Sequence, residues 1–157
     1  MTKLQGFKPF IDNDSKILIL GSFPSVKSRE NGFYYGNKQN RFWKTLATIF
    51  QENVPITLQE KQDLCRKHKI ALWDIVEESN LKGSSDQTLS KSIIKLADIK
   101  SLLINYPNIS KILCNGLLAY NLFIKHFKDD FPVVKMPSTS PANTRFNFEI
   151  WKKELII

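Results

Sequence analysis

The segment Ile17–Leu20 is the sequence feature that most constrains the fold. Four apolar residues in a row are followed at once by Gly21, and Pro24 lies three residues further on. A short apolar run that ends at Gly and Pro is typical of a strand buried on both faces, as in a parallel sheet. Because open α/β sheets place their sites at the carboxyl ends of strands, we expect a functional loop after this strand.

Strand-like and helix-like segments alternate along the rest of the chain. Further apolar strands are expected at residues 70–76, 110–114 and 133–136. Apolar residues at the 3.6-residue period, or polar segments with a few apolar anchors, predict helices at residues 40–50, 57–68, 93–103 (in one or two pieces), 117–127 and 146–155. A polar loop is expected at residues 80–87. This alternation predicts an α/β fold: a three-layer α/β/α sandwich with a mostly parallel four-stranded sheet.

The size and composition indicate one globular domain over residues 1–157, with 42% hydrophobic residues. No apolar run approaches the roughly 18 residues that span a membrane, and no signal peptide is recognisable, so we expect a cytoplasmic protein. Cys65 and Cys114 provide neither a disulfide framework nor a cluster site. His68 and His126 lack metal-ligand spacing, so neither a metal nor a cofactor is expected.

The charge balance favours a polyanionic partner. The chain carries 23 Lys and Arg against 15 Asp and Glu, a formal net charge of +8. Each phosphate that such a surface neutralises releases counterions, which favours nucleic-acid binding. A solvated basic surface without such a partner is the alternative. Aromatic residues lie among basic ones at residues 33–35 and 41–43, where they could stack on bases or simply pack in the core.

Two loops carry most of the polar residues that could form a site. The first runs from Gly21 through Pro24 and continues to Asn40, and the second covers residues 136–143. Both follow predicted strands of the same parallel sheet. We therefore expect both loops at one edge of the sheet, facing one another.

Five motifs in these regions carry a resemblance to a known family. They are GSFPS after the first strand, YYGNKQNRFW before the next helix, LWDIVEESNLKGSSD, NG after the third strand, and MPSTSPAN. In this order, spanning residues 17–143, the chain resembles the uracil-DNA glycosylase superfamily. Among its branches it is most similar to the hypoxanthine (deoxyinosine) DNA glycosylases.

The resemblance implies hydrolysis of an N-glycosidic bond in DNA without a metal, after the damaged nucleotide is flipped into a pocket. Many superfamily members carry Asp or Asn before the proline of the first motif, where this chain has Phe23, and His or Asn where it has Met136. In the most similar family the water-activating role belongs to the Asn that matches Asn40. Without the family, Asn40 would be interpreted as a helix N-cap.

The resemblance and the predicted topology together give the candidate site residues. The candidate catalytic residue is Asn40, and the candidate base-pocket residues are Gly21, Ser22, Phe23, Pro24, Tyr35, Asp74 and Asn115. The candidate DNA-binding residues are Ser138, Thr139, Ser140, Lys27, Arg29, Arg41 and Arg145. Simpler roles stay open for several of them: core packing for Phe23, capping for Asp74 and Asn115, and ordinary turns for the three residues of the second loop.

The function predicted from the sequence is that of a monofunctional glycosylase of base excision repair, acting as a monomer on deoxyinosine or a related deaminated base. A uracil- or mismatch-specific glycosylase is the alternative within the same class. Because Phe23 and Met136 replace residues that many relatives use, a non-catalytic DNA-binding relative is a second alternative. A nucleotide-binding protein unrelated to DNA is disfavoured, since the sequence contains neither a P-loop nor a Rossmann fingerprint.

Overall fold

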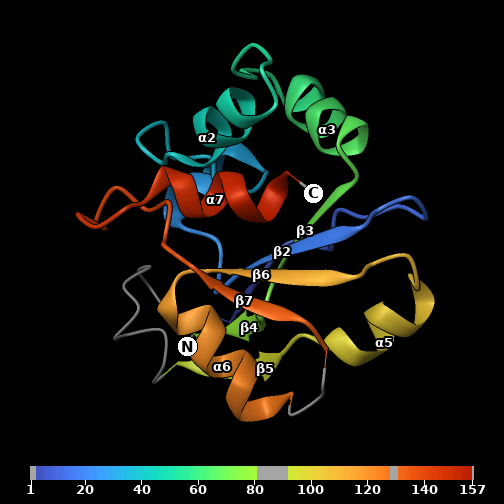
Figure 1. The fold of residues 1–157 in the computed structure, drawn as a ribbon. Coiled ribbons are helices and arrows are strands. Elements are labelled where there is room, and N and C mark those ends of the chain that lie inside the picture. Colours follow the sequence, from blue (N-terminus) through green and yellow to red (C-terminus); the bar gives the residue numbers. More distant parts are fainter. Residues whose placement is uncertain (1–2, 81–91, 128–130, 157) are drawn as a thin grey trace.

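A four-stranded parallel sheet lies between two layers of helices in the computed structural model, which describes residues 3–80, 92–127 and 131–156 (Figure 1). Its strands, in the order β3-β2-β6-β7, are β3 (Ile70–Asp74), β2 (Ile17–Gly21), β6 (Lys111–Asn115) and β7 (Val133–Met136). One layer contains α2 (Phe42–Ile49), α3 (Leu58–Lys67) and α7 (Phe148–Leu155), and the other contains α5 (Ile99–Asn105) and α6 (Leu117–His126). The predicted α/β/α sandwich is confirmed, and all three strand pairings are parallel.

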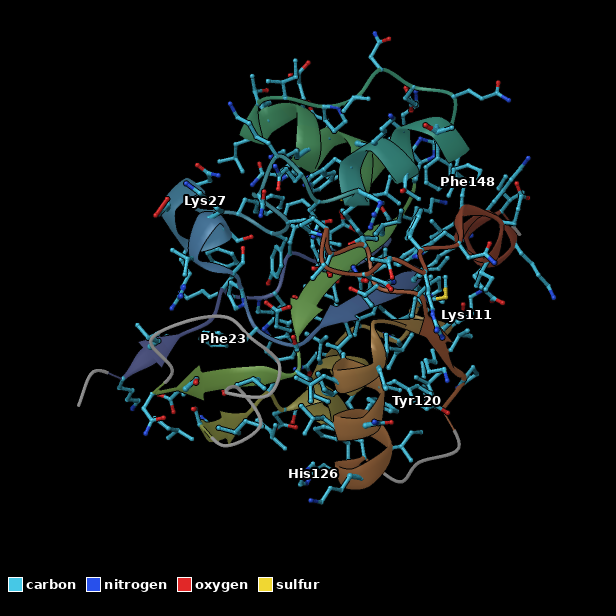
Figure 2. All side chains as sticks on the ribbon, turned by 90° about the vertical axis from the view of Figure 1, so that its left-hand side faces the viewer. Phe23, Lys27, Lys111, Tyr120, His126 and Phe148 are labelled. Carbon is cyan, nitrogen blue, oxygen red and sulfur yellow. The ribbon has the colours of Figure 1, made fainter. Side chains whose placement is uncertain are left out.

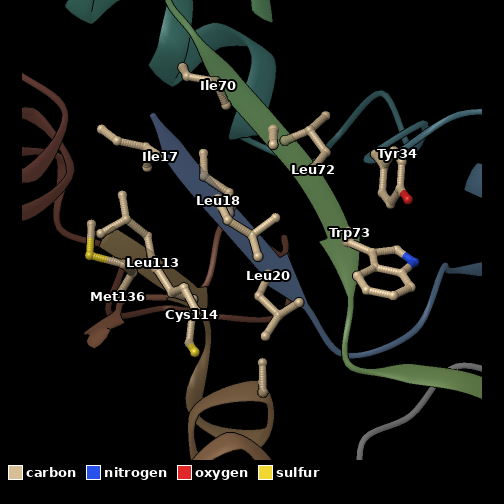
Figure 3. Packing of buried hydrophobic residues seen from close by; sticks show 14 of the residues in the cluster. Ile17, Leu18, Leu20, Tyr34, Ile70, Leu72, Trp73, Leu113, Cys114 and Met136 are labelled. Carbon is tan, nitrogen blue, oxygen red and sulfur yellow. The ribbon is translucent and has the colours of Figure 1, made fainter. Parts of the chain in front are cut away.

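Strand β2 lies at the centre of the core. Leu18, Ile19 and Leu20 are fully buried, because β3 and β6 flank the strand and helices cover both faces of the sheet. Figure 3 shows Leu18 and Leu20 between Leu72 of β3 and Leu113 of β6. The apolar run in the sequence therefore reports burial on both faces, as expected for a central parallel strand.

A second, smaller sheet corrects two of our predictions. It has the antiparallel order β1-β4-β5, formed by β1 (Leu4–Gln5), β4 (Val76–Ser79) and β5 (Ile93–Leu96). The strand predicted at residues 70–76 divides at Ile75, after which the chain enters this sheet. The helical prediction at residues 93–96 was wrong, since an apolar spacing of three residues fits both a helix and an irregular strand. The polar loop predicted at residues 80–87 lies outside the described residues except for Asn80.

The helix ends follow capping chemistry, with one correction. The helix predicted from Asn40 begins at Phe42, so Arg41 rather than Asn40 occupies the N-cap position. Helix α3 begins as predicted, after a capping box between Thr57 and Glu60. A short helix α1 (Val26–Asn31), which the sequence did not suggest, is capped by Ser25. Within the described residues no helix is long and apolar enough to cross a membrane.

Candidate active site

A cavity of about 480 Å³ lies at the carboxyl edge of the parallel sheet. The two loops predicted to face each other both line it, together with residues from the segment 34–40 and the start of α6. Of the predicted site residues, those that line the cavity are Gly21, Ser22, Phe23, Pro24, Tyr35, Asn40, Asp74, Asn115, Ser138, Thr139 and Ser140. The structure therefore brings the expected base-pocket residues together, and the cavity volume is in the range of ligand pockets.

The end of β2 forms one wall of this cavity. Glycine is required at residue 21 because there is no room for a side chain at this position. A Cβ atom at residue 21 would collide with Asp74 Oδ1 and lie 3.1 Å from the hydroxyl of Tyr35. The Asp74 carboxyl comes from the end of β3, directly beside Gly21 in the sheet register. The absence of a side chain at Gly21 thus lets Asp74 and Tyr35 approach the end of the central strand.

Asp74 and Tyr35 each bury a polar atom that makes no hydrogen bond of good geometry to any of the described residues. These atoms are Asp74 Oδ2 and the Tyr35 hydroxyl oxygen. Burial raises the pKa of Asp74 from its ordinary value of 3.8 to about 7. Burial, and secondly the Asp74 carboxylate, raise the pKa of Tyr35 far above its ordinary range. The nearby Asn115 side chain opposes this shift but does not outweigh it, so Tyr35 keeps its proton. Because buried polar groups are normally hydrogen-bonded, this pair points to a polar ligand.

Tyr35 is held in an unusual backbone conformation. Its φ angle is 54°, in the left-handed region that non-glycine residues rarely adopt. Its ring stacks on Phe42 with 4.0 Å between the centroids, and the following turn is fixed by a hydrogen bond from Gly36 N to Ser28 Oγ of 2.9 Å. The surrounding contacts therefore hold the Tyr35 side chain against the cavity at some cost in backbone strain.

Asn40 lies on the cavity wall just before α2. Its side-chain Oδ1 accepts a hydrogen bond of 2.9 Å from the backbone N–H of Phe42. Its backbone N–H donates to the carbonyl of Asn37, also at 2.9 Å. These bonds fix the side chain while leaving a second lone pair on Oδ1 and the Nδ2 donors, for which the described residues provide no partner. Asn40 can therefore both brace the start of α2 and orient a small polar molecule such as water.

The second loop is tied to β6 through Asn115. The Asn115 amide donates from Nδ2 to Thr139 Oγ1 and accepts from Thr139 N, both at 3.0 Å. Thr139 is 1% exposed, so it supports the loop from beneath, whereas Ser138 and Ser140 are half-buried. The Asn115 amide is thus engaged with the second loop and not with a helix cap, since α6 begins after Gly116 without a side-chain cap.

Arg41 connects the two loops. Its Nη1 donates to the carbonyls of Ser140 at 2.9 Å and Asn143 at 3.1 Å. Its backbone N–H also donates to the carbonyl of Thr139 at 3.0 Å. The guanidinium group, predicted as a phosphate contact, therefore lies against the backbone of the second loop, where it braces that loop.

The other predicted phosphate-binding side chains lie outside the cavity lining. Lys27 on α1 is exposed and forms an ion pair of 3.7 Å with Glu30, and the Arg29 guanidinium lies 5.7 Å from the centroid of the Phe23 ring. Figure 2 shows Phe23 and Lys27 on the same side of the molecule. Arg145 is exposed beyond the second loop. For these three basic residues, contact with DNA stays a prediction.

Sequence analysis missed some residues of the cavity lining. Asn37 lies in the turn before Asn40, and Leu117 at the start of α6 is 59% exposed at the cavity although it is apolar. Gly116 precedes it with a φ angle of 104°. The NG pair marked this turn, but nothing in the sequence indicated that the first residue of the following helix would face the cavity.

The described residues contain no group of three or more His, Cys, Asp or Glu side chains that could hold a metal ion. In the described cavity lining, Asp74 is the one carboxyl group. One carboxylate with amides and hydroxyls is suited to hydrogen bonding with a neutral polar ligand rather than to binding a divalent cation. The donor set thus fits recognition of a polar heterocycle.

Comparison with known proteins assigns this arrangement to a class. The family model described as "Uracil DNA glycosylase superfamily" matches residues 8–156, so the chain belongs to the uracil DNA glycosylase superfamily. Among curated proteins it is 34% identical over 146 residues to a hypoxanthine DNA glycosylase of Methanosarcina acetivorans, covering 91% of this chain and 90% of that one. A hypoxanthine DNA glycosylase of Methanosarcina barkeri is 34% identical over 116 residues, covering 73% of this chain and 72% of that one.

The fold has a close match among solved structures. The solution NMR structure of a candidate uracil DNA glycosylase from Methanosarcina acetivorans superposes with a TM-score of 0.82 and 28% sequence identity. The match covers 98% of this chain and 97% of that one. The whole chain therefore has the fold of its superfamily.

Proposed function

We propose that this chain removes hypoxanthine from deoxyinosine in DNA, as a monofunctional glycosylase that acts as a monomer in the cytosol. Membership of the superfamily makes it a DNA glycosylase of deaminated bases. The choice of hypoxanthine is supported by the names of the two curated relatives and by the chemistry of the cavity. The observation that carries the proposal is the unpartnered Asp74–Tyr35 pair in the same cavity as Asn40.

Asp74 is the proposed reader of the base edge. Deamination of adenine replaces an amino group by a carbonyl and places a proton on the adjacent ring nitrogen, which creates a lactam edge. A neutral carboxyl group donates one hydrogen bond and accepts another, so it can pair with the carbonyl and the N–H of that edge. Because burial brings the pKa of Asp74 to about 7, the neutral form is available near physiological pH. The Tyr35 hydroxyl provides one more donor.

Asn40 is the proposed water-positioning residue. In the reaction, the bond between C1′ and the base nitrogen breaks, and water supplies the hydroxyl that forms the new C1′–O bond. The base leaves with the bonding electron pair and takes up the proton that water releases. An amide is too weak a base to remove that proton before the bond breaks, so its role is to orient water towards a cation-like sugar.

Uracil excision is the second candidate function, because uracil presents a lactam edge like that of hypoxanthine. The same Asp74 carboxyl could pair with either base. Phe23 supports the assignment of the water-orienting role to Asn40 in both cases, since a phenyl ring can neither donate nor accept a hydrogen bond.

Single-turnover cleavage tests the proposed function. Labelled duplexes with deoxyinosine, uracil or a G·T mismatch are incubated with excess protein and treated with alkali to reveal abasic sites. We expect strand breaks at deoxyinosine for the wild type and a loss of about 100-fold or more in rate for Asn40→Ala, with DNA binding retained. Asn121→Ala is the matched control, because Asn121 is an exposed amide on α6 outside the cavity lining.

Each outcome of this experiment has a distinct meaning. Strand breaks only at uracil would support the proposed reaction but show that the substrate is uracil and not hypoxanthine. Equal rates for Asn40→Ala and the wild type would remove Asn40 from the mechanism. No excision of any base by the wild type, with binding intact, would contradict the proposed function.

A further inference from the structure

A second hollow lies beside the candidate active site. Its volume is about 570 Å³, and it is bounded by residues of the segment 31–44 and of the segment 54–61. Tyr35, Asn37 and Asn40 line both hollows, so one short segment forms the wall between them. Anything that occupies the second hollow therefore lies next to the cavity that is proposed to receive the base.

The charges around this hollow all have one sign. Lys38, Lys44 and Lys61 line it, and the described part of its lining contains neither Asp nor Glu. Within the described residues, none of these three lysines takes part in a salt bridge. They differ in this from Lys67, which pairs with Glu52 at 3.0 Å. Three unneutralised ammonium groups around one hollow create a local site for an anion with several charges.

Apolar side chains form part of the remaining lining, beside the amides of Asn31, Asn37 and Asn40. Trp43 lines the hollow and is 5% exposed, and the ammonium group of Lys61 lies 5.6 Å from the centroid of its ring, which helps to hold this lysine in place. Val54 and Ile56 also line the hollow and are 49% and 82% exposed. A ligand that fits such a surface combines several negative charges with apolar faces.

We propose that this hollow is a second DNA subsite, which holds the sugar–phosphate backbone of the damaged strand on one side of the flipped nucleotide. The phosphates lie against Lys38, Lys44 and Lys61, and the deoxyribose faces pack against the apolar wall. The inference rests on the proposed function for its ligand. It assigns to the segment 35–40 a second role, as the ridge over which the strand passes from the second hollow into the active site.

Quantitative DNA binding tests the subsite without relying on excision. Equilibrium binding of an undamaged duplex is measured over a range of salt concentrations for the wild type and for the triple variant Lys38→Gln, Lys44→Gln, Lys61→Gln. Because each phosphate contact contributes about 0.9 to the slope of log K against log salt, loss of the three contacts lowers the magnitude of that slope by about 3. The affinity falls at low salt.

A second measurement locates the subsite along the DNA. Duplexes are shortened stepwise from one end or the other towards a central deoxyinosine. The wild type loses affinity on shortening from either end. The triple variant becomes insensitive to shortening from one end only, the end that enters the subsite.

The matched control removes the same number of charges elsewhere. Lys16 and Lys69 precede β2 and β3 at the amino edge of the sheet, and Lys125 lies beside His126 at the end of α6 that is remote from the site (Figure 2). The triple Gln variant at these positions keeps the wild-type salt slope and footprint. If both triple variants weaken binding equally, or if the Lys38–Lys44–Lys61 variant binds as the wild type does, the subsite is disproved. Thermal melting of both variants establishes that each is folded.

Discussion

At the scale of single residues, the site combines groups that a stable core would avoid. Asp74 buries a carboxyl oxygen that has no hydrogen bond to a described residue. Tyr35 buries a hydroxyl group in the same condition, and its backbone lies in the left-handed region. Gly21 gives both groups the space they need. Perturbed groups that share a cavity are typical of functional sites, since neither packing nor hydrogen bonding within the protein accounts for them.

The first residue-scale prediction concerns Asp74 and pH. If the neutral carboxyl pairs with the lactam edge, wild-type excision falls as the pH rises through about 7, the pKa of Asp74. An amide also donates and accepts, so Asp74→Asn keeps base recognition and loses this pH dependence, whereas Asp74→Ala loses recognition. Single-turnover rates from pH 5 to 9 measure the three profiles. A pH dependence in Asp74→Asn identical to that of the wild type would refute the assignment.

Stability gives an independent test of the same carboxyl. The pKa of Asp74 is raised in the folded chain, to about 7 against an ordinary value of 3.8. Between these values the folded state binds more protons than the unfolded state, so the free energy of unfolding falls as the pH rises from about 4 to 7. Asp74→Asn removes this contribution. Denaturant titrations at pH 5 and pH 8 therefore give a smaller difference for the variant than for the wild type.

At the scale of elements, the two loops form one unit because Arg41 joins them. The guanidinium contacts the carbonyls of Ser140 and Asn143, and Asn115 holds Thr139 from the sheet. Trp151 of α7 adds a hydrogen bond of 2.8 Å to the carbonyl of Pro137. The second loop is thus held by Arg41 at the start of α2, by Asn115 at the end of β6 and by Trp151 of α7. These contacts limit the motion of the loop.

Arg41→Met tests this bracing. The substitution keeps much of the apolar stem and removes the hydrogen bonds, so we expect a loss of about 1–3 kcal/mol in stability. Hydrogen exchange of the amides of residues 139–140 should become faster. The excision rate should fall by about 10- to 100-fold through misplacement of the loop.

Arg145→Met is the comparison for Arg41→Met, because Arg145 is exposed and was predicted to contact phosphate. It should weaken DNA binding while leaving the melting temperature unchanged. A weaker affinity without any loss of stability in Arg41→Met would instead favour a direct phosphate contact for Arg41.

The sequence allowed the parallel sheet and the facing loops to be predicted, because runs such as Ile17–Leu20 report burial on both faces. It did not allow prediction of the small sheet. The strand Ile93–Leu96 has only four residues, and its partner β4 is separated from β3 by the single residue Ile75, so the two strands look like one in the sequence. Long-range pairing decides such segments, not local periodicity. The same limit applies to Arg41 and Asn115, whose carbonyl and threonine partners lie 99 and 24 residues away, respectively.

At the scale of the whole molecule, the two sheets are joined by a continuous chain segment and by backbone hydrogen bonds. Strand β3 passes into β4 through the buried Ile75, and the backbone N–H groups of Ile75 and Val76 donate to the carbonyls of Gly21 and Ser22. The small sheet therefore cannot detach without disturbing the carboxyl end of β2. Unfolding should follow a single transition.

Leu113→Ala tests this cooperativity. Leu113 lies in β6 and is fully buried (Figure 3), so the substitution should lower the free energy of unfolding by about 2–5 kcal/mol. Far-ultraviolet circular dichroism and tryptophan fluorescence should still report one common midpoint. Ile104→Ala, at a position that is 72% exposed, should change stability by less than about 0.5 kcal/mol. Two separated transitions would mean that the sheets unfold independently.

The unpartnered groups around Gly21 also set a limit on how far this protein can be stabilised. Replacing Asp74 by an apolar residue of similar size would remove a buried carboxyl group and so relieve a local cost of folding, and a search for heat-resistant variants would select this change first. It would also remove a group proposed to hold the base. Thermal robustness and catalysis therefore compete at these positions, and engineering for durability should leave residues 21, 35 and 74 untouched and seek its gains in the helices on the far side of the sheet.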